Sequence, residues 1–355
     1  MAGFAGPPCR PGSGAGVAER TLWVSEASVT SVLDLAEAVD VLAEAFRAEG
    51  AGDVLPLDKT TMGFAGHATL HALGAASPRF AAVKAWAHTP GGADPALLLF
   101  DAASGSLVAV IEAFALGQMR TAGTAALATD RLARRSAASL AVIGTGKQAL
   151  PQVAAVAAVR DLREVRAWSP SEERREAFAR RVEERLGLEC RAAAGPAEAV
   201  AGADVVTLVT RATEPVLTDG LVRPGVHINA VGAIDLERTE FEPGILGRAS
   251  LVVTDSMSQA RSLSSELRAF YDPSPPGWGA VRTLGEVVHG EIRRGDDSEI
   301  TLFKGMGSGV EDLALGTAVL ERVQAAGGAP AITRTGRAQP RLAASTARKW
   351  GGDTL

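Results

Sequence analysis

The sequence predicts an α/β fold, in which a Rossmann-type doubly wound parallel sheet is joined to a discontinuous α+β domain. Three observations lead to this prediction. From residue 139 onward, short apolar runs alternate with helical segments, which is typical of a parallel sheet covered on both faces. Before residue 139, apolar runs follow one another between Gly and Pro turns. The chain has 355 residues, 46% of them hydrophobic, so it is long enough for two domains.

The first half contains a predicted amphipathic helix, several strands and a second helix. The amphipathic helix is expected over residues 31–49, where apolar side chains recur every three or four positions and Ser31 with Asp34 resembles a capping pair. Residues 69–114 hold three strand-like stretches, FAAVKAWA, ALLLFDA and LVAVIEA, separated by turns. Residues 116–134 have the pattern of a helix.

The second half alternates between strands and helices. The predicted strands are SLAVIG, EVRAWS, a short strand near 188–192, DVVTLVT, HINAVG and SLVVTD. The helices that we predict between and after them span residues 147–159, 172–186, 196–201 and 310–326.

These patterns suggest where the domains begin and end. Residues 130–309 should form the parallel-sheet domain, and residues 19–129 together with 310–327 the second domain. Residues 1–18 and 328–355 are rich in Gly, Pro, Ala and Arg and lack periodicity, so we expect disordered tails there.

Composition argues against several kinds of partner and location. The net charge is −5, with acidic and basic residues interspersed, so neither nucleic acid nor a membrane surface is an expected partner. No apolar run approaches the roughly 18 residues that cross a bilayer, and the first residues lack the apolar core of a signal peptide. Two distant cysteines suggest neither a disulfide framework nor a metal site. A cytoplasmic location is therefore expected.

A glycine-rich turn follows the strand that ends at Ile143. Its residues are Gly144, Thr145, Gly146, Lys147, Gln148 and Ala149, which match the pattern G-x-G-x-x-A. In this pattern the first glycine allows a tight turn, the second lets a pyrophosphate approach the backbone, and the small sixth residue lets helix and strand pack closely. Because the turn lies between a strand and a helix, it predicts a dinucleotide site with the phosphates at the helix N-terminus.

The second strand of the alternating region favours NADP(H) over NAD(H). NAD sites usually end this strand with an acidic residue that binds the ribose hydroxyls. Here the strand ends in Trp168-Ser169-Pro170-Ser171, and Arg174 follows. Hydroxyl groups and a guanidinium suit a 2′-phosphate. The alternative is that Arg174 and Arg175 lie on a solvated helix face, paired with neighbouring glutamates.

Six stretches, in order along the chain, resemble the ornithine cyclodeaminase/mu-crystallin family. They are AVKAWAHTP, GQMRTAGTAALAT, VIGTGKQA, NAVGAIDLERTEF, VVTDSMSQA and EITLFKGMGSGVEDLALG. The resemblance implies a Rossmann domain joined to a substrate-binding and dimerisation domain, and a homodimer. It also implies hydride exchange between a nicotinamide and the α-carbon of an amine or imine that carries a carboxylate.

Three cationic residues are candidates for binding that carboxylate. Lys84 lies within an apolar strand, where a lysine must either reach the surface or find an anion. The resemblance implies that Lys84 holds the substrate carboxylate, and a buried lysine beside another cation could also exchange protons. It implies a similar binding role for Lys59 and Arg120, with Arg120 and Thr121 also near the cofactor. The alternatives are an edge position for Lys84 and a surface position for Arg120.

The resemblance assigns the remaining candidates to the cofactor and the reaction. The predicted cofactor contacts are Thr210, Val231, Gly232, Arg238, Lys304 and Gly305, besides the glycine turn, Ser169, Ser171 and Arg174. Ile234 stands where an ornithine cyclodeaminase is expected to have an aspartate, and Asp235 follows it. Asp235 is therefore a candidate catalytic residue, but it could take the aspartate's role of binding the substrate amines only if the loop shifts. A buried diamine needs an anionic partner, so Ile234 puts ornithine cyclisation in doubt.

Together these features predict an NAD(P)H-dependent oxidoreductase that acts on the C–N bond of a small α-imino or α-amino acid. An imine or ketimine reductase and an amino-acid dehydrogenase both fit. Two alternatives remain open, which are an ornithine cyclodeaminase-type lyase with internally recycled NAD and an NADPH-bound protein that binds small ligands like mu-crystallin.

Overall fold

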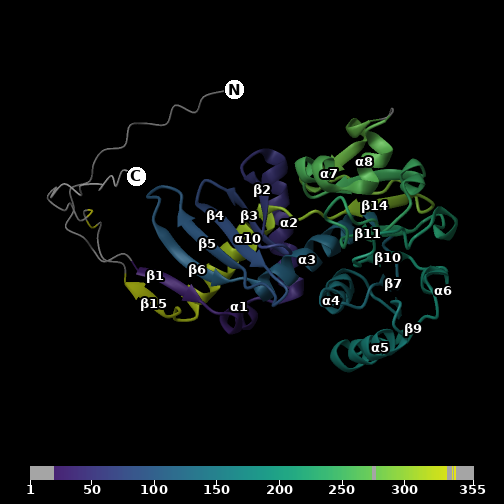
Figure 1. Cartoon of the computed structure of the whole chain (residues 1–355), viewed down its shortest axis with the longest axis horizontal. Helices are drawn as coiled ribbons and strands as arrows, with labels where there is room; N and C mark the ends of the chain where they lie inside the picture. The colour runs from purple at the N-terminus through teal and green to yellow at the C-terminus, as the bar shows by residue number, and fades with distance from the viewer. Residues whose placement is uncertain (1–19, 274–276, 334–337, 339, 341–355) are drawn as a thin grey trace, which may run out of the picture.

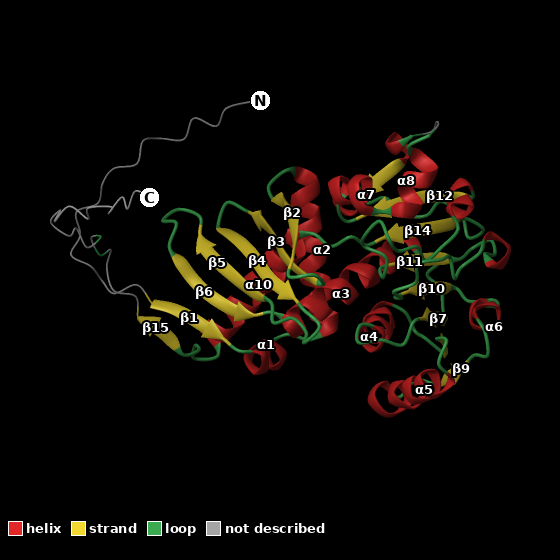
Figure 2. Cartoon of the chain, in the orientation of Figure 1, coloured by secondary structure: helices red, strands yellow, loops and turns green. Residues whose placement is uncertain are grey.

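Two β-sheets organise the chain, and a long helix runs between them (Figures 1 and 2). The computed structural model describes residues 20–273, 277–333, 338 and 340. The helix between the sheets is α3 (Phe114–Leu132), whose buried side chains belong to the same hydrophobic cluster as residues of both sheets. It crosses residue 130, where we place the domain boundary, so the exact division of the chain stays a prediction.

The first sheet has seven strands within the described residues, in the order β15-β1-β6-β5-β4-β3-β2. Neighbouring strands run antiparallel except β1 and β6, which are parallel. The strands are β1 (Arg20–Val24), β2 (Leu55–Phe64), β3 (Ala68–Ala76), β4 (Phe80–His88), β5 (Ala96–Asp101), β6 (Leu107–Glu112) and β15 (Ala331–Thr333).

Two helices occupy the region where one was predicted. They are α1 (Glu26–Val32) and α2 (Leu35–Ala51), so a single helix over 31–49 is wrong. Asp34 caps α2 in a reciprocal capping box with Glu37, and the N-cap of α1 is Ser25, so Ser31 takes no part in capping. The strand β2 was also missed, because its side chains are almost all exposed and show no alternation between apolar and polar residues.

The last helix, α10 (Gly309–Ala325), packs against the first sheet across β3 and β4. Its first residue touches the backbone of β3, since a Cβ at Gly309 would lie 1.7 Å from the carbonyl oxygen of Gly74. About two turns later, a Cβ at Gly316 would lie 2.4 Å from the side chain of Leu97 of β5. These close approaches fix where the first turn of α10, with Glu311 and Asp312, meets the sheet.

The second sheet has eight strands within the described residues, all parallel, in the order β13-β12-β14-β11-β10-β7-β8-β9. The strand order reverses beside β7, which is the topological switch point of a doubly wound sheet. The strands are β7 (Ser139–Ile143), β8 (Glu164–Trp168), β9 (Cys190–Ala192), β10 (Val205–Leu208), β11 (His227–Ala230), β12 (Ala249–Thr254), β13 (Val281–Thr283) and β14 (Ile300–Lys304).

Helices cover the second sheet, and several lie where they were predicted. The α4 and α5 helices follow β7 and β8, and α5 has the predicted bounds. The full set is α4 (Ala149–Val159), α5 (Glu172–Leu186), α6 (Pro196–Val200), α7 (Met257–Leu263), α8 (Ser265–Tyr271) and α9 (Leu284–His289). The α/β fold with a Rossmann-type parallel sheet is therefore confirmed. Among the described residues, none of the helices combines the length and the apolar character that crossing a bilayer requires.

The prediction of a disordered tail from residue 328 is wrong for its first residues. Residues 331–333 form β15, and Leu22 of β1 pairs with Ala331. The pattern was misread because three residues are too few to show periodicity, and the pairing partner lies at the other end of the chain. The predicted N-terminal tail, residues 1–18, lies outside the described residues, as do residues 334–355 except 338 and 340.

Candidate active site

The glycine turn lies at the switch point of the second sheet. Gly144 has φ of 104°, and a Cβ there would lie 2.6 Å from the carbonyl oxygen of Val209, so only glycine fits. At Gly146, by contrast, a Cβ would meet no atom within 4 Å, which leaves the backbone open to an approaching group. The α4 helix begins at Ala149 without a side-chain cap. The Ala149 N–H donates to the carbonyl of Gly146 at 3.1 Å and Pro151 has no N–H, so a phosphate would be bound mainly by the N–H groups of the turn that precedes the helix. These features fit a dinucleotide pyrophosphate.

A cavity of about 660 Å³ extends from this turn towards the first sheet. It is lined by residues of α3, the glycine turn, the loops after β10, β11 and β14, and the start of α10, together with single residues of β4, α5 and β14 and Asp255 after β12. The lining side chains include the predicted Arg120, Thr121, Lys147, Gln148, Arg174, Thr210, Val231, Gly232 and Gly305, and also His88, Thr124, Ile234, Asp255, Met306 and Glu311.

A neighbouring cavity of about 460 Å³ shares Gly146, Arg174 and Thr210 with the first. Gly144, Thr145, Ser169 and Ser171 line it, and no carboxylate is among its described lining residues. The Arg174 guanidinium has no ion pair with a described residue. Arg175 instead donates to the carbonyl of Ser169 at 3.3 Å and lies 3.9 Å from Glu172. Arg174 therefore fits the interpretation as a contact for a 2′-phosphate. Arg175 fits the alternative, in which the arginine pairs with a glutamate of its own helix.

A buried glutamate that the sequence analysis did not single out fixes two of the strand ends. Glu240 accepts hydrogen bonds from the backbone and hydroxyl of Thr210 through Oε1, at 2.7 and 2.9 Å. Its Oε2 accepts from the backbone N–H groups of Gly232 and Ala233, at 2.8 and 3.0 Å. The carboxylate therefore fixes the loops after β10 and β11 relative to each other. Its place within NAVGAIDLERTEF was visible in the sequence, but its long-range partners were not.

Asp255 performs a similar task for the loop after β14. Its two carboxylate oxygens accept hydrogen bonds from the backbone N–H groups of Met306 and Gly307, both at 2.8 Å. Lys304, predicted as a cofactor contact, is not among the cavity-lining residues. It is fully buried and its ammonium lies 3.2 Å from Glu266, so its charge is neutralised inside the parallel-sheet domain.

The three candidate cations lie close together at the end of the cavity nearest the first sheet. Arg120 lines the cavity, and Lys84 lies behind the lining, 3% exposed, with its ammonium 2.6 Å from Asp312. Lys59 is likewise absent from the cavity lining, and it makes no hydrogen bond or ion pair with a described residue. Burial, together with the charge of Arg120, lowers the pKa of Lys59 to about 8. Burial also lowers the pKa of Lys84, against the opposing effect of Asp312.

Two acidic residues of α10 balance these cations. Glu311 and Asp312 are fully buried in the first turn of α10, where the helix dipole favours negative charge. Oε2 of Glu311 accepts a hydrogen bond from Arg120 at 2.8 Å. The other oxygen of each carboxylate, Oε1 of Glu311 and Oδ2 of Asp312, has no hydrogen-bond partner among the described residues. In the sequence, the two acids are only a favourable start for the last helix, and the fold alone brings them to Arg120 and Lys84.

The loop after β11 places Ile234 and Asp235 differently. Ile234 lines the cavity, whereas Asp235 does not and its side chain is 43% exposed. The Asp235 carboxylate lies 3.3 Å from Arg238, which is likewise absent from the cavity lining. The structure therefore does not bring Asp235 or Arg238 to the site that the other candidates form.

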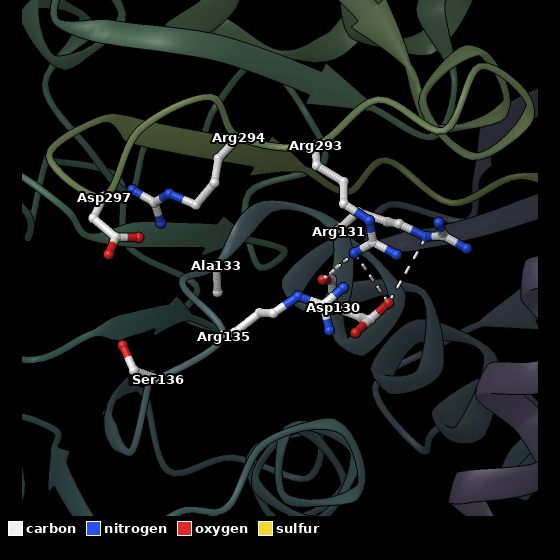
Figure 3. Close-up of a pocket in the computed structure, with 8 residues that line it drawn as sticks. All are labelled: Asp130, Arg131, Ala133, Arg135, Ser136, Arg293, Arg294 and Asp297. Carbon is white, nitrogen blue, oxygen red and sulfur yellow. Dashed lines mark hydrogen bonds and ion pairs between the residues drawn. The ribbon is translucent and has the colours of Figure 1, made fainter.

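A further cavity, of about 360 Å³, lies at the opposite end of α3 (Figure 3). It is lined by Asp130, Arg131, Ala133, Arg135, Ser136, Arg293, Arg294 and Asp297. Several of these arginines donate to carbonyl oxygens at the end of α3, as Arg293 does to Asp130 and Arg294 to Leu132, each at 3.2 Å. This arrangement satisfies the last carbonyls of the helix.

Comparison with known proteins identifies the family of this chain. The family model of the ornithine cyclodeaminase/mu-crystallin family matches residues 19–327. The chain belongs to this family. Among curated members, it is 33% identical over 228 residues to a Delta(1)-pyrroline-2-carboxylate reductase of Bacillus cereus, covering 64% of this chain and 70% of that protein. It is 36% identical over 217 residues to the ketimine reductase mu-crystallin of Mus musculus, covering 61% of this chain and 66% of that protein.

Solved structures of the family agree with the fold. The chain matches Thermococcus litoralis Delta(1)-pyrroline-2-carboxylate reductase in complex with NADH and L-proline, with a TM-score of 0.82, 25% identity, and coverage of 87% of this chain and 99% of that one. It matches the iminosuccinate reductase of Paracoccus denitrificans in complex with NAD⁺, also at 0.82, with 26% identity and coverage of 88% and 99%. Members of the ornithine cyclodeaminase/mu-crystallin family thus bind a nicotinamide dinucleotide, which the glycine turn of this member fits.

Proposed function

We propose that this member of the ornithine cyclodeaminase/mu-crystallin family reduces the C=N bond of a small α-imino acid with NAD(P)H. One observation carries the proposal. A single cavity joins the glycine turn after β7 to Arg120, with Lys59 and Lys84 close to that guanidinium. The curated relatives include reductases of Delta(1)-pyrroline-2-carboxylate and of ketimines, which supports a substrate that combines an imine with a carboxylate.

The cavity-lining residues divide between the cofactor and the substrate. A bound nicotinamide cofactor would supply hydride to the carbon of the C=N bond. Gly144, Gly146 and the start of α4 would hold its pyrophosphate, while Val231 and Gly305 border the space for the ring. Arg120 would bind the substrate carboxylate through parallel hydrogen bonds. The ammonium of Lys59, which has no described partner, would neutralise the same carboxylate, and fixing it places the imine carbon for attack.

The cavity favours an apolar substrate side chain over a diamine. Ile234 lines it at the position where a cyclodeaminase is expected to have an aspartate. Asp235 points its carboxylate to Arg238 instead. A second ammonium on the substrate would then be buried without an anion, which is costly. This supports a reductase rather than an ornithine cyclodeaminase.

The cofactor is proposed to be NADP(H) in preference to NAD(H). Ser169, Ser171 and Arg174 line the cavity beside the glycine turn, and Arg211, which the sequence analysis did not consider, lines it too. Neither arginine has a described ion-pair partner, so both are available to a 2′-phosphate.

We also propose that the active form of the protein is a homodimer and that it is located in the cytoplasm. The edge strand β2 and its neighbour β3 expose large apolar side chains, and an edge strand of this kind is usually covered. These side chains are Leu55, Leu57, Met62, Phe64 and Leu70, which are 41–62% exposed. A related structure, an archaeal alanine dehydrogenase with 28% identity and a TM-score of 0.82, is described as a dimer with bound NAD.

The proposal is tested by following NADPH oxidation with the full chain. The substrates are pyrroline-2-carboxylate, piperideine-2-carboxylate, and pyruvate with ammonium or methylamine. Oxidation with one or more of these imino acids, and its loss with the corresponding imines that lack a carboxylate, is expected. Ammonia release from ornithine without net change in NADPH would instead identify a cyclodeaminase. Tight NADPH binding with no oxidation of any substrate would identify a ligand-binding protein.

A further inference from the structure

Glu311 differs from Glu240 and Asp255, the buried acids that hold the loops of the site, and from Asp312, which lies outside the cavity lining. Both oxygens of Glu240 and of Asp255 accept backbone hydrogen bonds. Glu311 lines the cavity, is fully buried, and uses only Oε2, which accepts from Arg120 at 2.8 Å. Its Oε1 has no partner among the described residues. A buried carboxylate oxygen without a donor is costly, so this oxygen calls for either a proton or a ligand.

The charges around Glu311 and its partner Arg120 come from four segments besides the helix of Glu311. Burial raises the pKa of Glu311 well above its usual value, the Arg120 guanidinium opposes this, and the negative charges of Asp255 and Asp312 reinforce it. The groups that interact with Glu311 or with its partner Arg120 are Arg120 on α3, Asp255 after β12, Asp312 on α10, Lys84 on β4 and Lys59 on β2.

We propose that Glu311 is the proton donor to the imine nitrogen, protonated through Oε1 when a substrate carboxylate occupies Arg120. This rests on the proposed imine reductase activity. A substrate carboxylate at Arg120 adds a second negative charge to a guanidinium that Glu311 already uses. Two carboxylates that share one site do not both stay ionised, so the buried one takes the proton.

The step balances without any further reactant. Hydride from the reduced nicotinamide adds to the imine carbon as the C=N π-bond breaks, and the electron pair goes to nitrogen. The proton on Glu311 forms the N–H bond, so the product is the secondary or primary amine. Glu311 is left as a carboxylate that Arg120 stabilises once the product carboxylate departs, and it regains a proton from water.

Other titratable groups near the site are less suited to this task. The ammonium of Lys84 is committed to Asp312 at 2.6 Å and lies outside the cavity lining. Asp235 is paired with Arg238 and is likewise outside it. His88 lines the cavity but is exposed, at the end of β4. Lys59 also lies outside the cavity lining, but it is the strongest competitor, because it has no described partner and its pKa is lowered to about 8.

The first measurement detects the proton itself and needs no turnover. Infrared difference spectra of the full chain, recorded with and without L-proline as a carboxylate ligand, should contain the C=O stretching band of a protonated carboxyl group in the ligand-bound state. The band should shift in heavy water, disappear in Glu311→Gln and persist in Lys59→Gln. Persistence of the band in Glu311→Gln, or its absence from the wild-type protein with bound L-proline, would overturn the proposal.

The second measurement tests the transfer. Glu311→Gln keeps the shape of the side chain and an oxygen for Arg120, so KM should stay within a few-fold while kcat falls about 10²- to 10⁴-fold. The wild-type kcat should fall as pH rises above the pKa of Glu311, and this dependence should be absent in the variant. Glu311→Asp, which keeps an acidic proton, should recover part of the loss. Glu321→Gln, a half-exposed glutamate of the same helix paired with Arg79, is the control and should behave as wild type.

The outcomes separate this proposal from the one on which it rests. A wild-type chain that reduces imino acids, together with a Glu311→Gln variant of equal kcat, would overturn the donor role alone. A wild-type chain that reduces no imino acid would overturn the proposed function and the donor role with it. Thermal unfolding of each variant should give wild-type cooperativity, which confirms that a loss of kcat is not a loss of folded protein.

Discussion

The two ends of α3 are both crowded with charge, yet only one has the properties of a reactive site. At the C-terminal end, Arg160 donates to the carbonyls of Thr129, Asp130 and Ala133, at 2.9, 3.0 and 3.1 Å. Arg293 and Arg294 add further bonds to the same turn. These cations serve the helix end, where four carbonyls lack partners within the helix.

Towards the other end of α3, the charges pair with each other beside a cavity instead of saturating the backbone. Arg120 meets Glu311, which keeps one oxygen free of described partners, and Lys59 has no described partner. This difference indicates that a cluster of arginines marks a ligand-binding site only when some of its hydrogen-bond donors and acceptors have no partner within the protein. A structural cluster uses its donors on the fold, whereas a binding cluster retains donors and acceptors for a ligand.

The largest expected effect comes from exchanging an arginine at each end of α3 for methionine. Arg120→Met removes a charge-assisted bond to the substrate, so kcat/KM should fall about 10³-fold, within the cost of truncating a buried hydrogen-bonded charge pair. NADPH affinity, measured by cofactor fluorescence, should stay within a few-fold. Glu311 can protonate once its cation is gone, so the variant should still fold.

Arg131→Met is the matched control at the opposite end. Arg131 lies 3.0 Å from Glu291, whose side chain is 62% exposed, so its loss should lower the melting temperature slightly. Turnover should be unchanged. If Arg131→Met lost as much kcat/KM as Arg120→Met, the distinction between the two ends would be wrong.

A pH series on Lys59 sharpens the comparison, with a smaller expected effect. Burial and Arg120 lower its pKa to about 8, so the ammonium is present below pH 8 and is lost as the pH rises through that value. Binding of pyruvate, whose carboxylate stays ionised throughout, should therefore weaken above pH 8. Lys59→Gln should weaken binding about 10- to 100-fold at pH 7, the cost of one hydrogen bond to a charged group.

Lys59→Arg keeps a positive charge up to much higher pH and provides the control. Its pyruvate affinity at pH 7 should stay near that of wild type, and the weakening centred near pH 8 should disappear. Isothermal titration from pH 6.5 to 9.5 measures both variants. Wild-type affinity in Lys59→Gln at pH 7 would place Lys59 outside the carboxylate site.

The sequence predicted the parts of the molecule that rest on local patterns. The apolar alternation after residue 139 predicted the parallel sheet, and the G-x-G-x-x-A pattern predicted a turn whose glycine at 144 is indeed required by its positive φ. The helix over 172–186 was placed correctly, because Ser171 caps it and Gly187 ends it in the left-handed conformation. Such signals lie within a few residues of the feature that they predict.

What the sequence could not predict depends on contacts between distant segments. The pairing of Arg120 with Glu311 spans 191 residues, and that of Lys84 with Asp312 spans 228. In the sequence, Glu311 and Asp312 look like acids that favour a helix start, which they also are. Lys304 illustrates the opposite error, since a lysine beside a glycine-rich loop suggests a ligand, but Glu266 neutralises it in the interior.

The smallest expected effect concerns the cofactor and compares two adjacent arginines of α5. Arg174 lines the cavity beside the glycine turn and has no described ion-pair partner, whereas Arg175 donates to Ser169 and lies near Glu172. Arg174→Ala should raise the Kd of NADPH about tenfold, because an exposed arginine loses one charge-assisted bond to the 2′-phosphate, and should leave the Kd of NADH unchanged. Arg175→Ala should affect the affinity for both cofactors equally, since its role is to support the loop.

Fluorescence titrations at low and high salt measure these constants, and the preference for NADPH should shrink with salt in the wild type but not in Arg174→Ala. An equal loss of NADH and NADPH affinity in Arg174→Ala would mean that Arg174 binds the shared pyrophosphate, and the proposed NADP(H) preference would then have to come from Arg211 and the two serines alone.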